Sequence, residues 1–201
     1  MASAMIDGRR FYSLVSLLTL VFSSVHLASQ VSAWLDVPFV QQTRKLCGPA
    51  CVAMIMAYWD RRAERDPSES RQRPSFPEIC NALETSNANG VSGEEIGRYF
   101  NQAGFQTYIF QGTWNDVQDH LLRGRPLLIA LGMPGGNNHY VVLVGWDWRQ
   151  GVVLVNDPAR RKLTKMSRPD FDVSWQRTGC WTLLSLPKTG SMNVSSTEIT
   201  R

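Results

Sequence analysis

The hydrophobic pattern of the chain is strongest over residues 47–56, where CGPACVAMIM places apolar side chains on nearly every face of a helix. A helix that is apolar all round is a buried helix, and polar residues return only from Asp60. Pro49 suits the first turn, where a missing N–H costs nothing. We therefore expect a central buried helix from Gly48 to about Arg61.

Beyond this helix, the pattern predicts short helices first and strands afterwards. Further helices are expected over residues 77–85, between the N-cap Ser92 and Gly104, and over residues 114–123, where Val117, Leu121 and Leu122 should face inward. After an extended lead-in at 34–40, strands are expected over residues 105–110, 126–131, 139–146, 152–156 and 180–186. The charged, aperiodic stretch 61–77 indicates an exposed loop. This order predicts an α+β fold with a mainly antiparallel sheet packed on the central helix.

The two ends of the chain differ in composition from the predicted domain, 34–187. Arg9 and Arg10 precede an apolar run, and Val31-Ser32-Ala33 offers small residues for cleavage, so residues 1–33 are typical of a secretory signal peptide. An uncleaved anchor is the alternative, although the serines in the run disfavour a stable membrane span. Residues 188–201 are polar, and we expect them to be disordered.

Composition narrows the function classes. The chain has 201 residues and a formal charge of +4, with its basic residues scattered along the sequence, which argues against a nucleic-acid partner. The cysteines show no CxxC pair, which disfavours a metal site, and we expect no cofactor. Export would permit a disulfide, and Cys80 with Cys180 is the candidate pair.

Cys47 lies at the start of the predicted helix, a position that favours the nucleophilic thiolate form of a cysteine. The N–H groups and dipole at a helix start stabilise a thiolate, and Arg44 and Lys45 act in the same direction. Gln41, six residues upstream, can donate to an oxyanion, and Gln42 competes for that role. Cys51, one turn further along, is surrounded by apolar residues and is predicted to be part of the core.

A base and a group that orients it should lie elsewhere. After residue 33 the sequence has two histidines, and His120 falls on a charged helix face, where we expect a surface residue. His139 follows the glycine-rich loop 132–138 and opens an apolar strand, a suitable place for proton transfer. Asp157 ends the strand that should return beside His139 and is the candidate orienting group, with Asn156 as a substitute.

These residues resemble a known family. Gln41, the Cys47-Gly48-Pro49-Ala50 helix start, the His139-Tyr140-Val141-Val142 strand and Asn156-Asp157-Pro158 are similar to the papain-like bacteriocin-processing peptidases that cut after a double glycine, in particular to stand-alone exported members. The resemblance implies a papain-like fold with Cys47 as nucleophile, His139 as general base and acid, Asp157 as orienting residue and Gln41 as oxyanion donor. Transporter-linked members continue into membrane helices and an ATPase, which this sequence lacks, so the substrate stays open.

Three functions fit these observations. The first is an exported, metal-independent cysteine peptidase acting on a peptide or protein. The second is a transpeptidase or acyltransferase of similar fold, as in phytochelatin synthases, in which another nucleophile replaces water. The third is a catalytically idle peptide-binding module. Trp146, Trp148 and Trp175 are either cleft residues or core residues.

Overall fold

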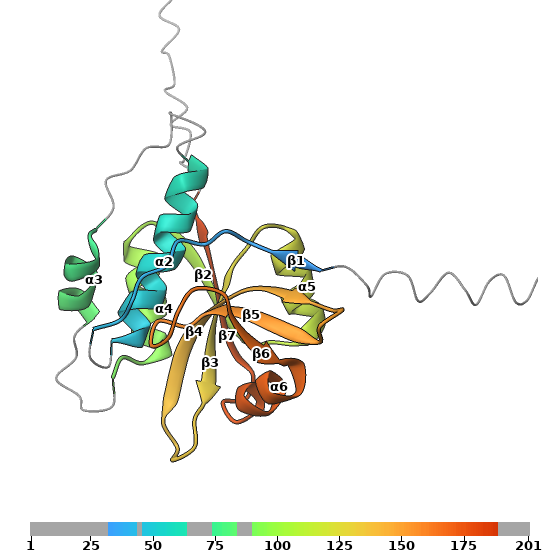
Figure 1. Cartoon of the computed structure of the whole chain (residues 1–201). Helices are drawn as coiled ribbons and strands as arrows, with labels where there is room; N and C mark the ends of the chain where they lie inside the picture. Colours follow the sequence, from blue (N-terminus) through green and yellow to red (C-terminus); the bar gives the residue numbers. More distant parts are fainter. Residues whose placement is uncertain (1–31, 44–45, 64–73, 84–89, 189–201) are drawn as a thin grey trace, which may run out of the picture.

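The computed structural model describes residues 32–43, 46–63, 74–83 and 90–188 (Figure 1). Several predictions concern residues outside the described ranges. They are most of the expected signal peptide, the two basic residues Arg44 and Lys45, most of the charged loop at 61–77 and nearly all of the C-terminal tail.

The central buried helix is confirmed as α2 (Cys47–Ala63). Every residue from Gly48 to Met56 is buried, and the two arginines Arg61 and Arg62 stand in the last turn, where positive charge suits the helix dipole. The all-round apolar sequence therefore produced the fully packed helix that it predicted.

The described part of the sheet has seven strands, and all of its pairings are antiparallel. Six strands lie in the order β2-β7-β3-β4-β5-β6, and β1 pairs with β4. Their bounds are Ala33–Trp34 for β1, Phe105–Gln111 for β2, Leu127–Gly132 for β3, Asn138–Asp147 for β4, Val152–Asn156 for β5, Thr164–Ser167 for β6 and Trp181–Pro187 for β7. The expected α+β architecture is thus observed.

Alternation along the strands divides the core into two layers. In β4, Val142 and Val144 pack with α2, α3 (Phe76–Leu83) and α4 (Gly93–Gln102), whereas Val141 and Leu143 pack with α5 (Trp114–Leu122) and α6 (Arg168–Gln176). Figure 1 shows these two helix groups on opposite sides of the sheet. Both faces of β4 are therefore buried, which holds this strand rigidly beside α2.

The shorter helices α4 and α5 begin at capping residues. The Ser92 hydroxyl accepts a hydrogen bond from the Glu95 N–H, and the Glu95 carboxylate accepts one from the Ser92 N–H, so α4 begins with the predicted cap. In α5, Val117 and Leu121 are buried as predicted, but Leu122 is exposed and that prediction was wrong. Val117 and Leu121 are four residues apart and share one face, while Leu122 points away from it.

The sequence prediction missed β6 and α6. The Ser167-Arg168-Pro169-Asp170 stretch carries a helix start, since the Ser167 hydroxyl accepts from the Asp170 N–H and the proline lies in the first turn. The short four-residue strand before it left little periodicity to detect.

The start of the described chain is held by the sheet. Ala33 and Trp34 pair with Trp146 and Gly145 of β4, and the Ser32 hydroxyl donates a hydrogen bond to Asp147. A side chain on Gly145 would lie 2.4 Å from the carbonyl oxygen of Ala33, so this close approach requires glycine. The boundary expected at residue 33 therefore falls inside β1.

The expected disulfide between Cys80 and Cys180 is not formed in this structure. Cys180 carries a free thiol and packs with the layer of α5 and α6. Cys80 lies in α3, which packs on the opposite side of the sheet against α2 and α4. Placement in different layers, which the linear sequence does not reveal, separates the two thiols.

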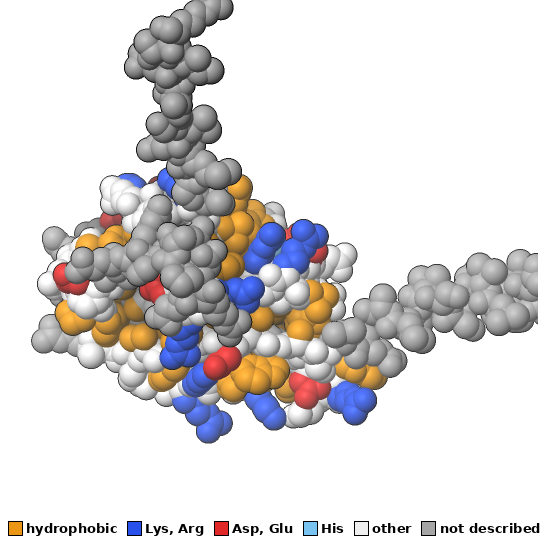
Figure 2. All heavy atoms as spheres, turned by 90° about the horizontal axis from the view of Figure 1, so that it is seen from above, with side chains coloured by type: hydrophobic (Ala, Val, Ile, Leu, Met, Phe, Trp, Pro, Cys, Tyr) orange, Lys and Arg blue, Asp and Glu red, His pale blue; other side chains and the backbone are white. Residues whose placement is uncertain are grey.

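On the face shown in Figure 2, the Lys and Arg side chains lie in several separate places among apolar ones, without a continuous stripe. Among the described helices, none combines the length and the apolar character that a membrane crossing requires.

Candidate active site

Cys47 is the first residue of α2, half-buried at the N-terminal end of the helix. The Leu46 carbonyl accepts the Ala50 N–H, which closes the first turn. Pro49 has no N–H, so the donors at this helix end are the N–H groups of residues before it. They and the helix dipole favour a negative charge on Cys47.

His139 lies near the start of β4, and Asp157 directly follows β5. The Nε2 atom of His139 is 2.7 Å from Oδ1 of Asp157. An ionised carboxylate only accepts hydrogen bonds, so Nε2 carries a proton and donates a hydrogen bond to Oδ1 of Asp157. The other ring nitrogen, Nδ1, is then the one that hydrogen-bonds Cys47. Three residues separated in the sequence thus form one chain of hydrogen bonds.

Electrostatics favour a charged Cys47–His139 pair. Burial alone would raise the pKa of the Cys47 thiol, but hydrogen bonds from the His139 ring and from the N–H groups of Tyr140 and Gly48 outweigh burial and lower it. For His139, burial acts to lower the pKa, yet Asp157 and Cys47 raise it to about 9. Burial opposes ionisation of Asp157 as well, but His139 holds the pKa of this carboxyl below its usual range. The arrangement suits a thiolate beside an imidazolium.

Asn156, the expected substitute for Asp157, lies elsewhere. Its side chain is fully buried, donates to the Val37 carbonyl at 3.1 Å and accepts from the Leu163 N–H at 3.0 Å. The Asn156 side chain therefore joins the lead-in segment to the loop after β5. Of the two candidates, only Asp157 contacts His139.

The two glutamines differ in their surroundings. Gln41 is exposed, whereas the side-chain oxygen of Gln42 is buried. The Gln42 N–H donates to the Pro158 carbonyl at 2.9 Å, which holds Gln42 against the loop that carries Asp157. The sequence analysis did not foresee this link between Gln42 and the loop that carries Asp157.

The sequence did not reveal an apolar wall beside Gly48, the residue after Cys47. Val91 and Tyr140 form this wall, and Trp181 packs against Tyr140. A side chain on Gly48 would lie 2.3 Å from the Val91 methyl group and 3.6 Å from the Tyr140 ring. The Tyr140 and Trp181 rings stand 5.5 Å apart between centroids. Burial is the main reason why the pKa of the Tyr140 hydroxyl rises to about 12. The Cys-Gly pair gave one indirect indication of this contact, because glycine often marks a close approach.

The remaining candidates lie outside this site. Cys51 is completely buried, and burial raises the pKa of its thiol well above the usual value, so it is a core residue as predicted. His120 is half-buried against Phe110, with 6.1 Å between ring centroids, which corrects the expectation of a surface residue. Trp146 and Trp175 are core residues in the layer of α5 and α6, and Trp148 is partly exposed.

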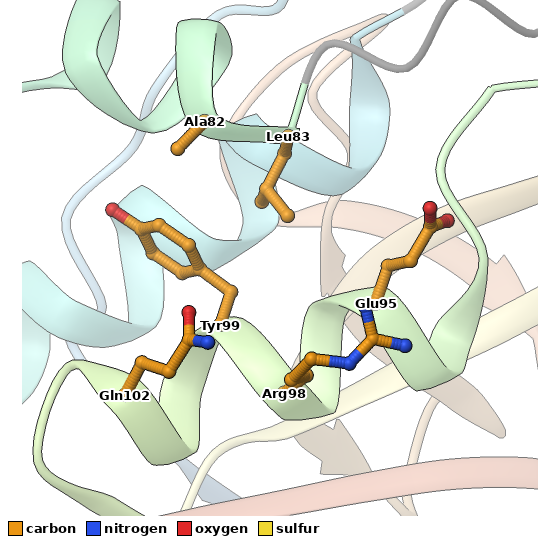
Figure 3. A pocket seen from close by; sticks show the side chains of 6 residues that line it. All are labelled: Ala82, Leu83, Glu95, Arg98, Tyr99 and Gln102. Atoms are coloured by element: carbon orange, nitrogen blue, oxygen red, sulfur yellow. The ribbon is translucent and has the colours of Figure 1, made fainter.

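A separate surface pocket of about 150 Å³ lies between α3 and α4 (Figure 3). Ala82 and Leu83 line it from α3, and the other lining residues are Glu95, Arg98, Tyr99 and Gln102 of α4. Its Glu95 carboxylate is held by the Ser92 cap. Cys47, His139 and Asp157 take no part in this pocket.

Within the described residues, no cluster of His, Cys, Asp and Glu has the composition of a metal site.

Comparison with solved structures identifies the fold. The peptidase domain of Streptococcus ComA, a bi-functional ABC transporter involved in quorum sensing, is 22% identical, with a TM-score of 0.57 over 76% of this chain and 100% of that domain. A double glycine motif protease from an AMS/PCAT transporter, solved with its leader peptide, is 20% identical, with a TM-score of 0.57 over 79% of this chain and 100% of that one. A putative C39-like peptidase from Bacillus anthracis is 19% identical, with a TM-score of 0.57 over 79% and 99% of the two chains.

No protein with curated annotation matches the chain. The sequence profile of the Peptidase_C39 like family, however, matches residues 34–183, which is most of the chain and includes Cys47, His139 and Asp157. The fold of the solved peptidase domains agrees with this match. The chain belongs to the Peptidase_C39 like family of papain-like cysteine peptidases.

Proposed function

We propose that this cysteine peptidase hydrolyses peptide bonds through a Cys47–His139–Asp157 triad. The observation that carries the proposal is the continuous chain of hydrogen bonds from the Cys47 thiol, at the start of α2, through His139 to Asp157, with 2.7 Å in its last link. A nucleophile, a base and an orienting carboxylate in contact are the minimum set for acyl transfer.

In the first half of the reaction, the Cys47 thiolate attacks the carbonyl carbon and a C–S bond forms. The electron pair of the C=O bond moves to oxygen, where the N–H at the helix start and a glutamine, Gln41 or Gln42, donate hydrogen bonds. His139 gives its proton to the leaving nitrogen as the C–N bond breaks. A thioester on Cys47 and a free amine result.

In the second half, water replaces the amine. His139, now neutral, accepts a proton from the water, whose oxygen attacks the thioester carbonyl. The C–S bond breaks, the acyl product leaves as a carboxylic acid, and the thiolate–imidazolium pair is restored. Asp157 keeps the ring in one tautomer throughout.

Two features support a peptide as the substrate and export as the location. The double glycine motif protease from an AMS/PCAT transporter was solved with a leader peptide. By analogy, we propose that this chain cleaves a peptide with small residues at the cleaved bond. The family match begins at Trp34, directly after the expected signal peptide of residues 1–33, which supports an exported domain.

The test is hydrolysis of a mixture of synthetic peptides, some with a Gly-Gly sequence, in ¹⁸O-labelled water, followed by mass spectrometry. The proposal expects new carboxyl termini that carry ¹⁸O with the wild-type protein and none with Cys47→Ala, while Cys51→Ala retains the activity. Products joined to an added amine, without ¹⁸O, would instead show a transpeptidase. Cleavage that persists in Cys47→Ala would refute the mechanism.

A further inference from the structure

The two oxygens of the Asp157 carboxylate have different partners. Oδ1 accepts hydrogen bonds from His139 Nε2 at 2.7 Å and from the Ala159 N–H at 2.9 Å. Oδ2 faces the guanidinium of Arg160, whose Nε lies 3.4 Å away. The Arg160 N–H also donates to the Asp157 carbonyl at 2.9 Å, so a tight turn fixes the start of the Arg160 side chain. The carboxylate is thus held from both sides.

The charges at the two ends of this contact are unequally exposed. The Asp157 side chain is only 11% exposed, whereas that of Arg160 is 69% exposed. A pair with one solvated partner is weak but still acts on the buried group. Because Arg160 and protonated His139 are cations beside one carboxylate, they repel each other, and this repulsion offsets part of the attraction between Asp157 and His139.

The titratable groups around the triad come from several elements. The Cys47 thiolate contacts His139 from α2, and the fully buried Cys51 responds to the charges of Cys47 and Asp157. Tyr140 responds to Cys47, Cys51 and Glu95 of α4. In the part of the chain that the structure describes, Arg160 is a cation that contacts Asp157 through Oδ2, the oxygen that His139 does not contact.

We propose that Arg160 is a positioning residue that fixes the Asp157 carboxylate against His139 and limits how tightly His139 holds its proton. This role rests on the proposed function for Cys47 and His139. A general acid works best when its pKa lies near the working pH, so a cation that weakens the grip of Asp157 helps His139 release the proton to the leaving amine.

The experiment is an NMR titration of the His139 ring in the full chain. The chain has three histidines, and a His139→Ala variant assigns the signal. In Arg160→Gln the apparent pKa of His139 should rise by about 0.2–0.7 pH unit, the range for a largely exposed ion pair. Arg160→Lys should restore the wild-type value. The difference should shrink at about 1 M salt, where screening is strong.

Arg161→Gln is the matched control. It removes the same charge one residue further on, from a side chain that is exposed and forms no ion pair with Asp157. An unchanged titration in Arg160→Gln, or an equal shift in Arg161→Gln, would overturn the positioning role. The readout needs no substrate, so failure of the proposed hydrolysis would appear separately in the peptide assay.

Discussion

Asn156 and Asp157 are consecutive residues, yet their side chains bind different partners. The Asn156 amide joins the Val37 carbonyl to the Leu163 N–H inside the core, while the Asp157 carboxylate accepts from His139. Successive side chains at a strand end point in different directions, so one position supports the fold and the next supports the site.

This separation predicts opposite effects of two substitutions. Asn156→Ala leaves the buried Val37 carbonyl and Leu163 N–H without partners and should lower the free energy of unfolding by about 2–4 kcal/mol. Asp157→Ala should change stability less and reduce kcat by a factor of about 10² or more, because His139 loses its orientation. Urea unfolding and peptide hydrolysis measure the two effects. The assignment fails if Asn156→Ala is the variant that loses activity while keeping its stability.

The two cysteines of α2 should behave differently toward iodoacetamide. Cys47 is half-buried with a lowered pKa, and Cys51 is completely buried with a raised pKa. Peptide mapping of the folded protein at neutral pH should show that, of these two cysteines, only Cys47 carries the alkyl group, and Cys51 should react only after unfolding. Equal labelling of both residues in the native state would contradict the packing described for α2.

The activity should depend on pH through both members of the Cys47–His139 pair. Activity needs a thiolate on Cys47, which is lost when pH falls through the lowered pKa of that thiol. It also needs a protonated His139, which is lost when pH rises through about 9. Peptide hydrolysis should therefore decline on the acidic side as pH falls through the lowered pKa of Cys47, and on the alkaline side above about 9. If activity already declined as pH rose through the ordinary histidine pKa of about 6.5, the result would contradict the influence of Asp157 and Cys47 on His139.

Gly48→Ala tests the apolar wall. The added carbon would lie 2.3 Å from the Val91 methyl group, which forces α2 and Val91 apart. We expect a loss of about 1–3 kcal/mol in stability and slower alkylation of Cys47. Val91→Ala combined with Gly48→Ala should recover part of both losses, since the second change removes the obstructing methyl group. Additive losses in the double variant would argue against this contact.

Local chemistry in the sequence was enough to select Cys47, His139 and the pair Asn156 and Asp157 as candidates, because each stands at the end of an element with a strong pattern. The buried helix marks Cys47, and the apolar strands β4 and β5 mark the other two. The antiparallel return of β5 beside β4 then places Asp157 near His139.

What the sequence did not reveal depends on contacts between distant segments. The choice between Asn156 and Asp157 is decided by Val37 and Leu163, and the hydrogen bond from Gln42 to Pro158 distinguishes Gln42 from Gln41. The separation of Cys80 from Cys180 follows from which face of the sheet α3 covers. Such relationships arise from tertiary packing, which periodicity does not encode.

The most direct test of the central claim is the rate of Cys47 alkylation as a function of pH in the wild type and in His139→Ala. The account predicts that wild-type Cys47 reacts well below the ordinary thiol pKa of about 8.5, and that His139→Ala moves the reactivity to higher pH. Identical profiles in the two proteins, both with an ordinary thiol pKa, would show that no activated pair exists and would contradict the account.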